Sequence, residues 1–128
     1  MTVYKALAAY LKTKQSDLSI EFYPAQAPES ATTPFCVFKI IDDSPTTIHD
    51  GTYPSGSIIV QFDIYSKSLT EVDDRADQIK DLFVAKSIPI HADVEIGHAN
   101  SQNEFDDFDD EEKMYIRSFD LRMTYLKS

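Results

Sequence analysis

The residues of this chain that could bind a metal ion are concentrated in one acidic run. Seven carboxylates lie within nine residues: Glu104, Asp106, Asp107, Asp109, Asp110, Glu111 and Glu112. A calcium loop of the EF-hand type needs carboxylates at alternate positions, a central glycine and a distal glutamate. This run has no glycine, and Phe105 and Phe108 interrupt its spacing. We therefore interpret it as a solvated acidic loop at about residues 103–113 and predict no metal site.

The remaining reactive side chains form no catalytic pattern. His49, His91 and His98 are far apart in the sequence and have no metal-ligand spacing. The one cysteine, Cys36, lies in the apolar run 35–38, which predicts a buried thiol acting as a small hydrophobic residue. Three glycines cannot supply a phosphate-binding loop, and there is no nucleophile-elbow motif. The sequence therefore predicts no enzyme activity, no catalytic residue and no cofactor.

Charge and length restrict the class of protein further. The 128-residue chain has a formal net charge of −10, which disfavours a nucleic-acid-binding role. No segment approaches the roughly 18–20 apolar residues that a membrane-spanning helix needs, so we expect a soluble protein made in the cytoplasm. A chain of this length is expected to form one domain, residues 1–128.

Hydrophobic spacing predicts two amphipathic helices. In residues 3–13, apolar side chains recur at the helical spacing. The second helix follows a capping box, Ser68-Leu69-Thr70-Glu71, in which Ser68 would accept from the Glu71 N–H and the Glu71 side chain would reach back. Its apolar stripe is Leu69, Val72, Ala76, Ile79, Leu82 and Phe83.

Alternating or continuous apolar residues predict the strands. The clearest runs from Ser57 to Tyr65, with four apolar side chains on one face. Proline and glycine content predicts a loop at 24–34 and a long connection from Asp42 to Gly56. The other strands are expected at 18–23, 35–41, 92–101 and 114–126. This order predicts an α+β fold: a two-layer sandwich of two amphipathic helices packed on a mainly antiparallel sheet of four to five strands.

Several short stretches resemble the tail completion proteins of long-tailed phages and prophages, also called tail terminators or minor head–tail joining proteins. The stretches are Tyr23-Pro24, Ala27-Pro28, Pro34-Phe35-x-Val37-Phe38, Asp50-Gly51, Val60-Gln61-Phe62-Asp63-Ile64-Tyr65 and Arg117-Ser118-Phe119-Asp120-Leu121-x-Met123-x-Tyr125. Together they cover almost the full chain in the right order.

The resemblance implies a structural role in virion assembly. Proteins of this family form a ring, commonly a homohexamer, that terminates the tail tube and joins it to the head. The implied partners are other copies of the chain, the tail tube protein and a head-completion or connector protein. DNA would pass through the lumen without specific binding, and no membrane is involved. The implied location is the virion tail, after assembly in the host cytoplasm.

A ring of this kind needs two different contact patches on each subunit. In the connection from Asp42 to Gly56 we expect His49, Asp50, Gly51 and Tyr53 to contact a neighbour, because long loops suit this task. Sheet edges are a second possible contact, through strand addition. We expect the acidic run to line the lumen or its rim, where its charge would repel passing DNA.

Two alternatives to the ring subunit remain open. One is another neck or minor tail protein of similar fold. The other is a small acidic protein-binding module, for example one that sequesters a basic partner. A mimic of DNA would space its acids along a surface, whereas here they are clustered in one segment.

Overall fold

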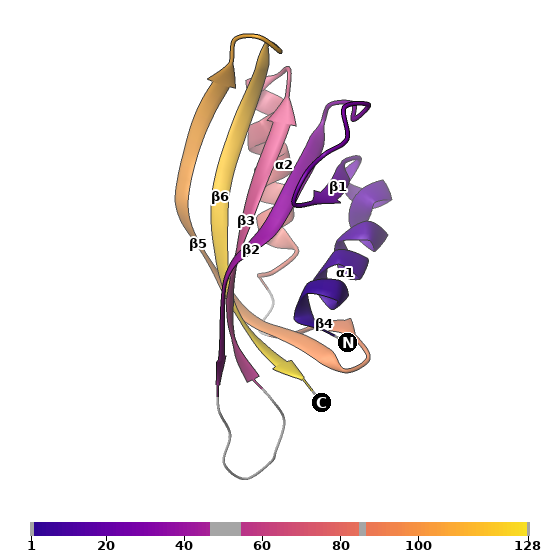
Figure 1. Ribbon diagram of the computed structural model, residues 1–128, viewed down its shortest axis with the longest axis vertical. Coiled ribbons are helices and arrows are strands. Elements are labelled where there is room, and N and C mark those ends of the chain that lie inside the picture. Colours follow the sequence, from indigo (N-terminus) through magenta and orange to yellow (C-terminus); the bar gives the residue numbers. More distant parts are fainter. Residues whose placement is uncertain (1, 47–54, 85–86, 128) are drawn as a thin grey trace.

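A computed structural model describes residues 2–46, 55–84 and 87–127 of the chain. Within them the elements follow one another in the order α1-β1-β2-β3-α2-β4-β5-β6 (Figure 1). Their bounds are α1 Val3–Leu18, β1 Glu21–Pro24, β2 Phe35–Thr46, β3 Ser55–Ser66, α2 Leu69–Asp81, β4 Ile88–His91, β5 Val94–Asp109 and β6 Met114–Lys127.

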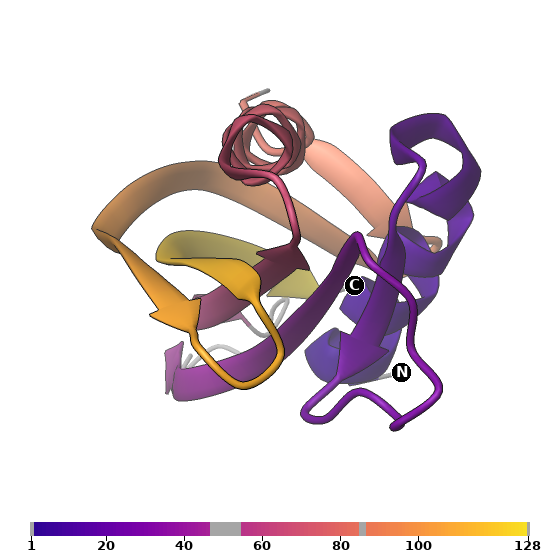
Figure 2. The same ribbon diagram turned by 90° about the horizontal axis from the view of Figure 1, so that it is seen from above.

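The six strands form one strongly curved mixed sheet in the order β1-β2-β3-β6-β5-β4. β1 pairs with β2 in parallel, and the other neighbours are antiparallel. Figure 2 shows both helices on the same side of this curved sheet. Helix α2 contacts β3 and β6, whereas α1 contacts both edge strands, β1 and β4. The sheet is therefore a half-barrel whose two edges meet at α1.

This architecture contradicts the predicted two-layer sandwich on four to five strands. The sheet has six strands, and one of its pairs is parallel. Strand twist accumulates along long strands, and four strands here have 12 to 16 residues, so the sheet curls instead of forming a flat layer. The sequence did not reveal β4 because its four residues are too few to show a periodic pattern.

The core lies between the concave face of the sheet and the two helices. The predicted inward face of β3 is confirmed, because its four apolar side chains are fully buried. Phe62 of β3 stacks on Phe119 of β6 with 5.4 Å between ring centroids. Helix α1 buries Val3, Ala6, Leu7 and Leu11, and α2 buries Val72, Ala76 and Ile79.

Helix α1 continues five residues past its predicted end, so Leu18 is helical and the next strand begins at Glu21. Thr2 caps its N-terminus by accepting from the Lys5 N–H at 3.1 Å. At the other end Ser19 adopts a left-handed conformation with φ 52°. The Gln15 side chain then accepts from the Phe22 N–H at 2.9 Å, which holds β1 against the helix.

The cap of α2 is a variant of the predicted capping box. The Ser68 hydroxyl accepts from the Glu71 N–H at 3.3 Å, as expected. The Glu71 carboxylate, however, accepts from the hydroxyl of buried Ser66 at 2.5 Å. The Ser66 oxygen in turn accepts from the Ser68 N–H at 3.1 Å. A third residue therefore joins the two halves of the cap.

Much of the predicted connection from Asp42 to Gly56 is strand. β2 continues to Thr46 and β3 begins at Ser55, with a register shift between Ile40 and Asp42. Gly56 lies within this paired region, and a Cβ atom there would come within 2.7 Å of the Ser44 carbonyl oxygen. Gly56, one of the prolines and glycines that suggested a loop, is instead required by the close approach of two strands.

Candidate assembly surface on the acidic hairpin

The acidic run forms the end of a long β-hairpin. Residues Glu104–Asp109 belong to β5, so the prediction of a loop over residues 103–113 is wrong for this part of the run. They pair with β6 in a register that places Asp107 opposite Ile116. The turn that follows is tightened by the Asp109 carboxylate, which accepts from the N–H groups of Glu111 and Glu112 at 3.0 and 3.2 Å.

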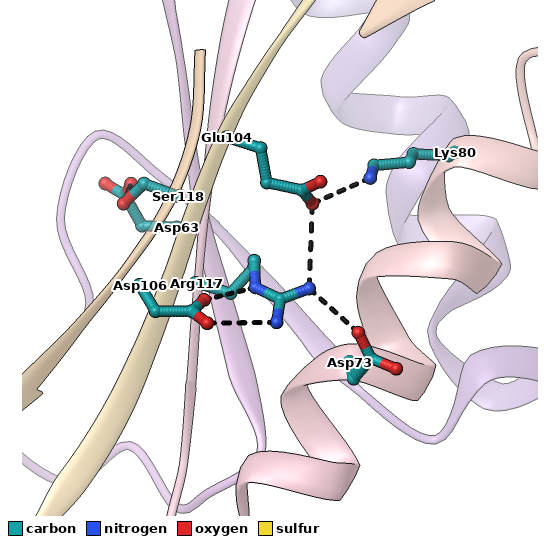
Figure 3. A network of polar contacts seen from close by, with 7 residues as sticks. All are labelled: Asp63, Asp73, Lys80, Glu104, Asp106, Arg117 and Ser118. Atoms are coloured by element: carbon teal, nitrogen blue, oxygen red, sulfur yellow. Dashed lines mark hydrogen bonds and ion pairs between the residues drawn. The ribbon is translucent and has the colours of Figure 1, made fainter. Parts of the chain in front are cut away.

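Strand geometry divides the acidic side chains between two faces, because successive residues of a strand point to opposite sides. Glu104 and Asp106 lie on the side of the sheet that faces α2, where both contact Arg117 of β6 (Figure 3). Phe105, Asp107 and Asp109 therefore lie on the opposite, convex side. This division places the four carboxylates of the strand in two pairs on opposite faces, and the other three lie in the turn.

Arg117 connects the hairpin to α2. Its Nε and Nη2 atoms donate to the two carboxylate oxygens of Asp106, the second at 3.1 Å, and Nη1 donates to Asp73 of α2 at 3.0 Å (Figure 3). Glu104 lies 3.7 Å from Nη1 and accepts from Lys80 of α2 at 2.7 Å. The Arg117 side chain is only 14% exposed. Its hydrogen bonds to Asp106 raise the pKa of the guanidinium above its ordinary value, so Arg117 is charged throughout the accessible pH range.

A second polar cluster lies on the convex face of the sheet. The Ser118 hydroxyl donates to Asp63 at 2.6 Å, and the Asn103 amide donates to Asp120 at 3.1 Å. Ser118 and Asp120 are buried although neither of the two described helices covers this face. These hydrogen bonds satisfy the carboxylates and join β3, β5 and β6.

The outer part of the hairpin remains acidic and partly apolar. Five carboxylates form no ion pair with any residue that the structure describes. They are Asp107, Asp109, Asp110, Glu111 and Glu112. Phe105 is 55% exposed, while Phe108 is 40% exposed and contacts the Tyr115 ring at 4.9 Å between centroids. The hairpin therefore presents unpaired negative charge together with accessible aromatic surface.

The other predicted contact residues, His49, Asp50, Gly51 and Tyr53, lie outside the described residues. Cys36 is fully buried, as predicted. Across residues 2–46, 55–84 and 87–127, no three His, Cys, Asp or Glu side chains are grouped so that they could hold a metal ion. Neither described helix is long and apolar enough to span a bilayer.

Sequence reasoning missed the network around Arg117. In the sequence Arg117 stands out only within a family-like stretch, and Asp73 and Lys80 carry no signal of their own. A signal for part of the network was present, because a hairpin turning at residues 110–113 places Arg117 opposite Asp106. The contacts with α2 depend on the curvature of the sheet, which no local pattern reveals.

Of three comparisons with known proteins, the one with solved structures finds matches. No family model matches the chain, and the search of curated proteins finds no match. Among solved structures, the chain is similar to a chain of "Virion of native gene transfer agent (GTA) particle", with a TM-score of 0.61. The two are 8% identical in sequence, and the alignment covers 94% of this chain and 93% of the other. The similarity shows a shared fold over nearly the whole length of both chains.

Proposed function

We propose that this chain is a structural subunit of a phage or prophage virion, and that it forms the ring that terminates the tail tube and joins it to the head. The observation that carries the proposal is the full-length similarity in fold to a chain of a gene transfer agent virion. The family-like stretches along the sequence support the more specific role at the end of the tail. We propose no enzymatic role.

The surface of the subunit suits a head-to-tail ring. Such a ring needs two different patches on each copy, so that contacts close around an axis. We propose that His49, Asp50, Gly51 and Tyr53 supply one patch. An open sheet edge supports a second: β1 pairs only with residues 35–38 of β2, so from Lys39 onward β2 has β3 as its only strand neighbour among the described residues.

The acidic hairpin has a defined place in this proposal. Glu104 and Asp106 are held against Arg117, and the other five carboxylates form no ion pair with a described residue. We propose that they line the lumen or its rim, where negative charge repels the DNA backbone. The tail tube protein and a head-completion protein would contact opposite faces of the ring.

The experiment that tests the ring is light scattering behind a sizing column over a wide range of protein concentration. We expect a species near six times the 14.5 kDa chain mass, visible as rings in the electron microscope. Purified tail tubes provide the second readout, because the protein should cap their ends and stop growth. A protein that is monomeric at every concentration and leaves tubes uncapped would contradict the proposal.

Two other functions remain as alternatives. A different neck or minor tail protein would also form a virion contact but would not cap tubes. A small acidic binding module is favoured by the unpaired carboxylates and by Phe105, and it would bind a basic partner as a monomer. The capping assay separates the first alternative from the ring subunit, and the oligomeric state separates the second.

A further inference from the structure

The backbone of β5 has one open side. β4 pairs only with residues 94–96 at the start of β5. From residue 97 to Asp109, β6 is the one strand neighbour of β5 in the part of the chain that the structure describes. An open edge of this length can accept another strand through main-chain hydrogen bonds.

The orientation of the open backbone groups follows from Phe108. Its N–H donates to the Asp107 side chain at 2.8 Å and so points away from β6. Backbone groups in a strand alternate with a period of two, so the N–H of Asp106 points the same way. The N–H of Asp106 is therefore available to an incoming strand, and the N–H of Phe108 becomes available when the Asp107 carboxylate turns to a cation of that strand.

The side chains along this edge indicate the chemistry of the partner. Asp107, Asp109 and the turn carboxylates carry negative charge without a cation from any described residue. Charges alone would serve to protect an edge from unwanted pairing. Phe105 is 55% exposed and Phe108 is 40% exposed, and such rings do not protect the edge from pairing, because exposed aromatic surface promotes association. The edge therefore combines negative charge with apolar anchors on both faces.

The charges also argue against a second copy of this chain as the occupant. The other open edge, residues 39–46 of β2, carries Lys39 but also Asp42 and Asp43. Each copy has a formal net charge of −10. Pairing these two edges would bring like charges together, which disfavours association.

We propose that the open edge of β5, at residues 104–109, accepts an extended lysine- or arginine-rich strand of a different protein. Main-chain hydrogen bonds at Asp106 and Phe108 would fix the strand. Its basic side chains would lie on the convex face, against Asp107, Asp109 and the Phe105 ring, and its apolar side chains would contact Phe108 on the opposite face. The proposal names a class of partner for the assembly proposed above, and it favours a position of the hairpin at the rim of the ring over one in the lumen. Its evidence comes from the edge of β5 alone.

The test uses the full-length protein and a synthetic peptide of alternating lysine and valine, about eight residues long to match an ordinary strand. Amide hydrogen exchange followed by NMR reports on each N–H. We expect the peptide to slow exchange at Asp106 and Phe108 about tenfold. A peptide of alternating glutamate and valine should have no effect.

Charge variants with the same net change provide the control. Asp107→Asn with Asp109→Asn should weaken binding of the lysine peptide about tenfold, since two exposed ion pairs are lost. Asp74→Asn with Asp77→Asn removes two exposed carboxylates from α2 and should leave binding unchanged.

Three outcomes would overturn the inference. Binding without slowed exchange at Asp106 and Phe108 would exclude strand addition at this edge. Equal weakening in the α2 control would show attraction to net charge alone. Slow exchange at these amides in concentrated protein without peptide would assign the edge to a second copy. None of these results depends on ring formation. The peptide assay can therefore contradict strand addition at β5 without contradicting the ring, and the capping assay can contradict the ring without contradicting strand addition.

Discussion

Arg117 is the residue that makes an acidic strand compatible with the fold. Its guanidinium lies between the hairpin and α2, and it contacts Asp106, Asp73 and Glu104. Without this charge, the three carboxylates would lie close together. The cation that the structure then places beside them is Lys80, which contacts Glu104. Like charges at that separation repel, and partial burial strengthens the effect.

We therefore expect Arg117→Met to lower the free energy of unfolding by about 1–3 kcal/mol, because several charge-assisted hydrogen bonds are lost. Urea unfolding at neutral pH measures the change. Arg122→Met is the matched control, because Arg122 is exposed on the same strand and should cost less than about 0.5 kcal/mol. Equal losses in the two variants would show that the network contributes nothing specific.

Burial gives Cys36 a pH-dependent effect on stability. Burial raises the pKa of its thiol well above 9.0, and the Asp63 carboxylate adds to the shift. Above pH 9 the unfolded chain therefore loses this proton while the folded chain keeps it. The unfolded state then binds fewer protons, so stability falls as pH rises, and below pH 9 there is no effect.

The expected slope is up to about 1.4 kcal/mol per pH unit above pH 9. Urea unfolding at several pH values between 8 and 10 measures it, with Cys36→Ala as the comparison. The variant is expected to be less stable overall, because it leaves a cavity, but to show a shallower slope. Parallel slopes for the two proteins would contradict this account of the thiol.

Among the secondary-structure elements, the paired region of β2 and β3 depends on one small residue. Gly56 lies against the Ser44 carbonyl oxygen and the Tyr125 hydroxyl, each 2.7 Å from where a Cβ atom would be. Gly56→Ala must displace the strand backbone, and we expect a loss of about 1–3 kcal/mol. Ser57→Ala, the neighbouring position, should change stability little. Thermal unfolding of both variants measures the difference.

An element could be predicted from the sequence when its own residues carried the hydrophobic pattern, and not when it depended on contacts with other segments. β3 and α2 were recognisable because Ile58, Phe62, Val72 and Ile79 repeat at the spacing of their own element. β4 was too short to repeat. The acidic half of β5 was mistaken for a loop, because the charges of Glu104 and Asp106 are compensated by Arg117 on the facing strand, and a run of like charges shows no sign of that partner. The curvature of the sheet is likewise set by contacts between distant segments.

At the scale of the whole molecule, the proposed position of the unpaired carboxylates at the lumen or rim of a tail ring can be tested by DNA ejection. We expect neutralisation of Asp107, Asp109, Asp110, Glu111 and Glu112 with Asn and Gln to slow DNA ejection, because DNA would no longer be repelled from the ring. Ring assembly should be unaffected, since Glu104 and Asp106 keep their contacts with Arg117. Ejection kinetics identical to those of the unmodified virion would exclude a role for these charges in the passage of DNA.

The position of α1 has a consequence for how the chain folds during its synthesis. Helix α1 is made first, yet it contacts both β1 and β4, and β4 begins only at Ile88. Until that segment has left the ribosome, the part of α1 that packs on β4 has no permanent partner. Ribosomes add roughly 5–20 residues per second, so this apolar surface stays open for several seconds. The nascent chain is therefore expected to engage chaperones through its first helix, and to release them when β4 and β5 emerge.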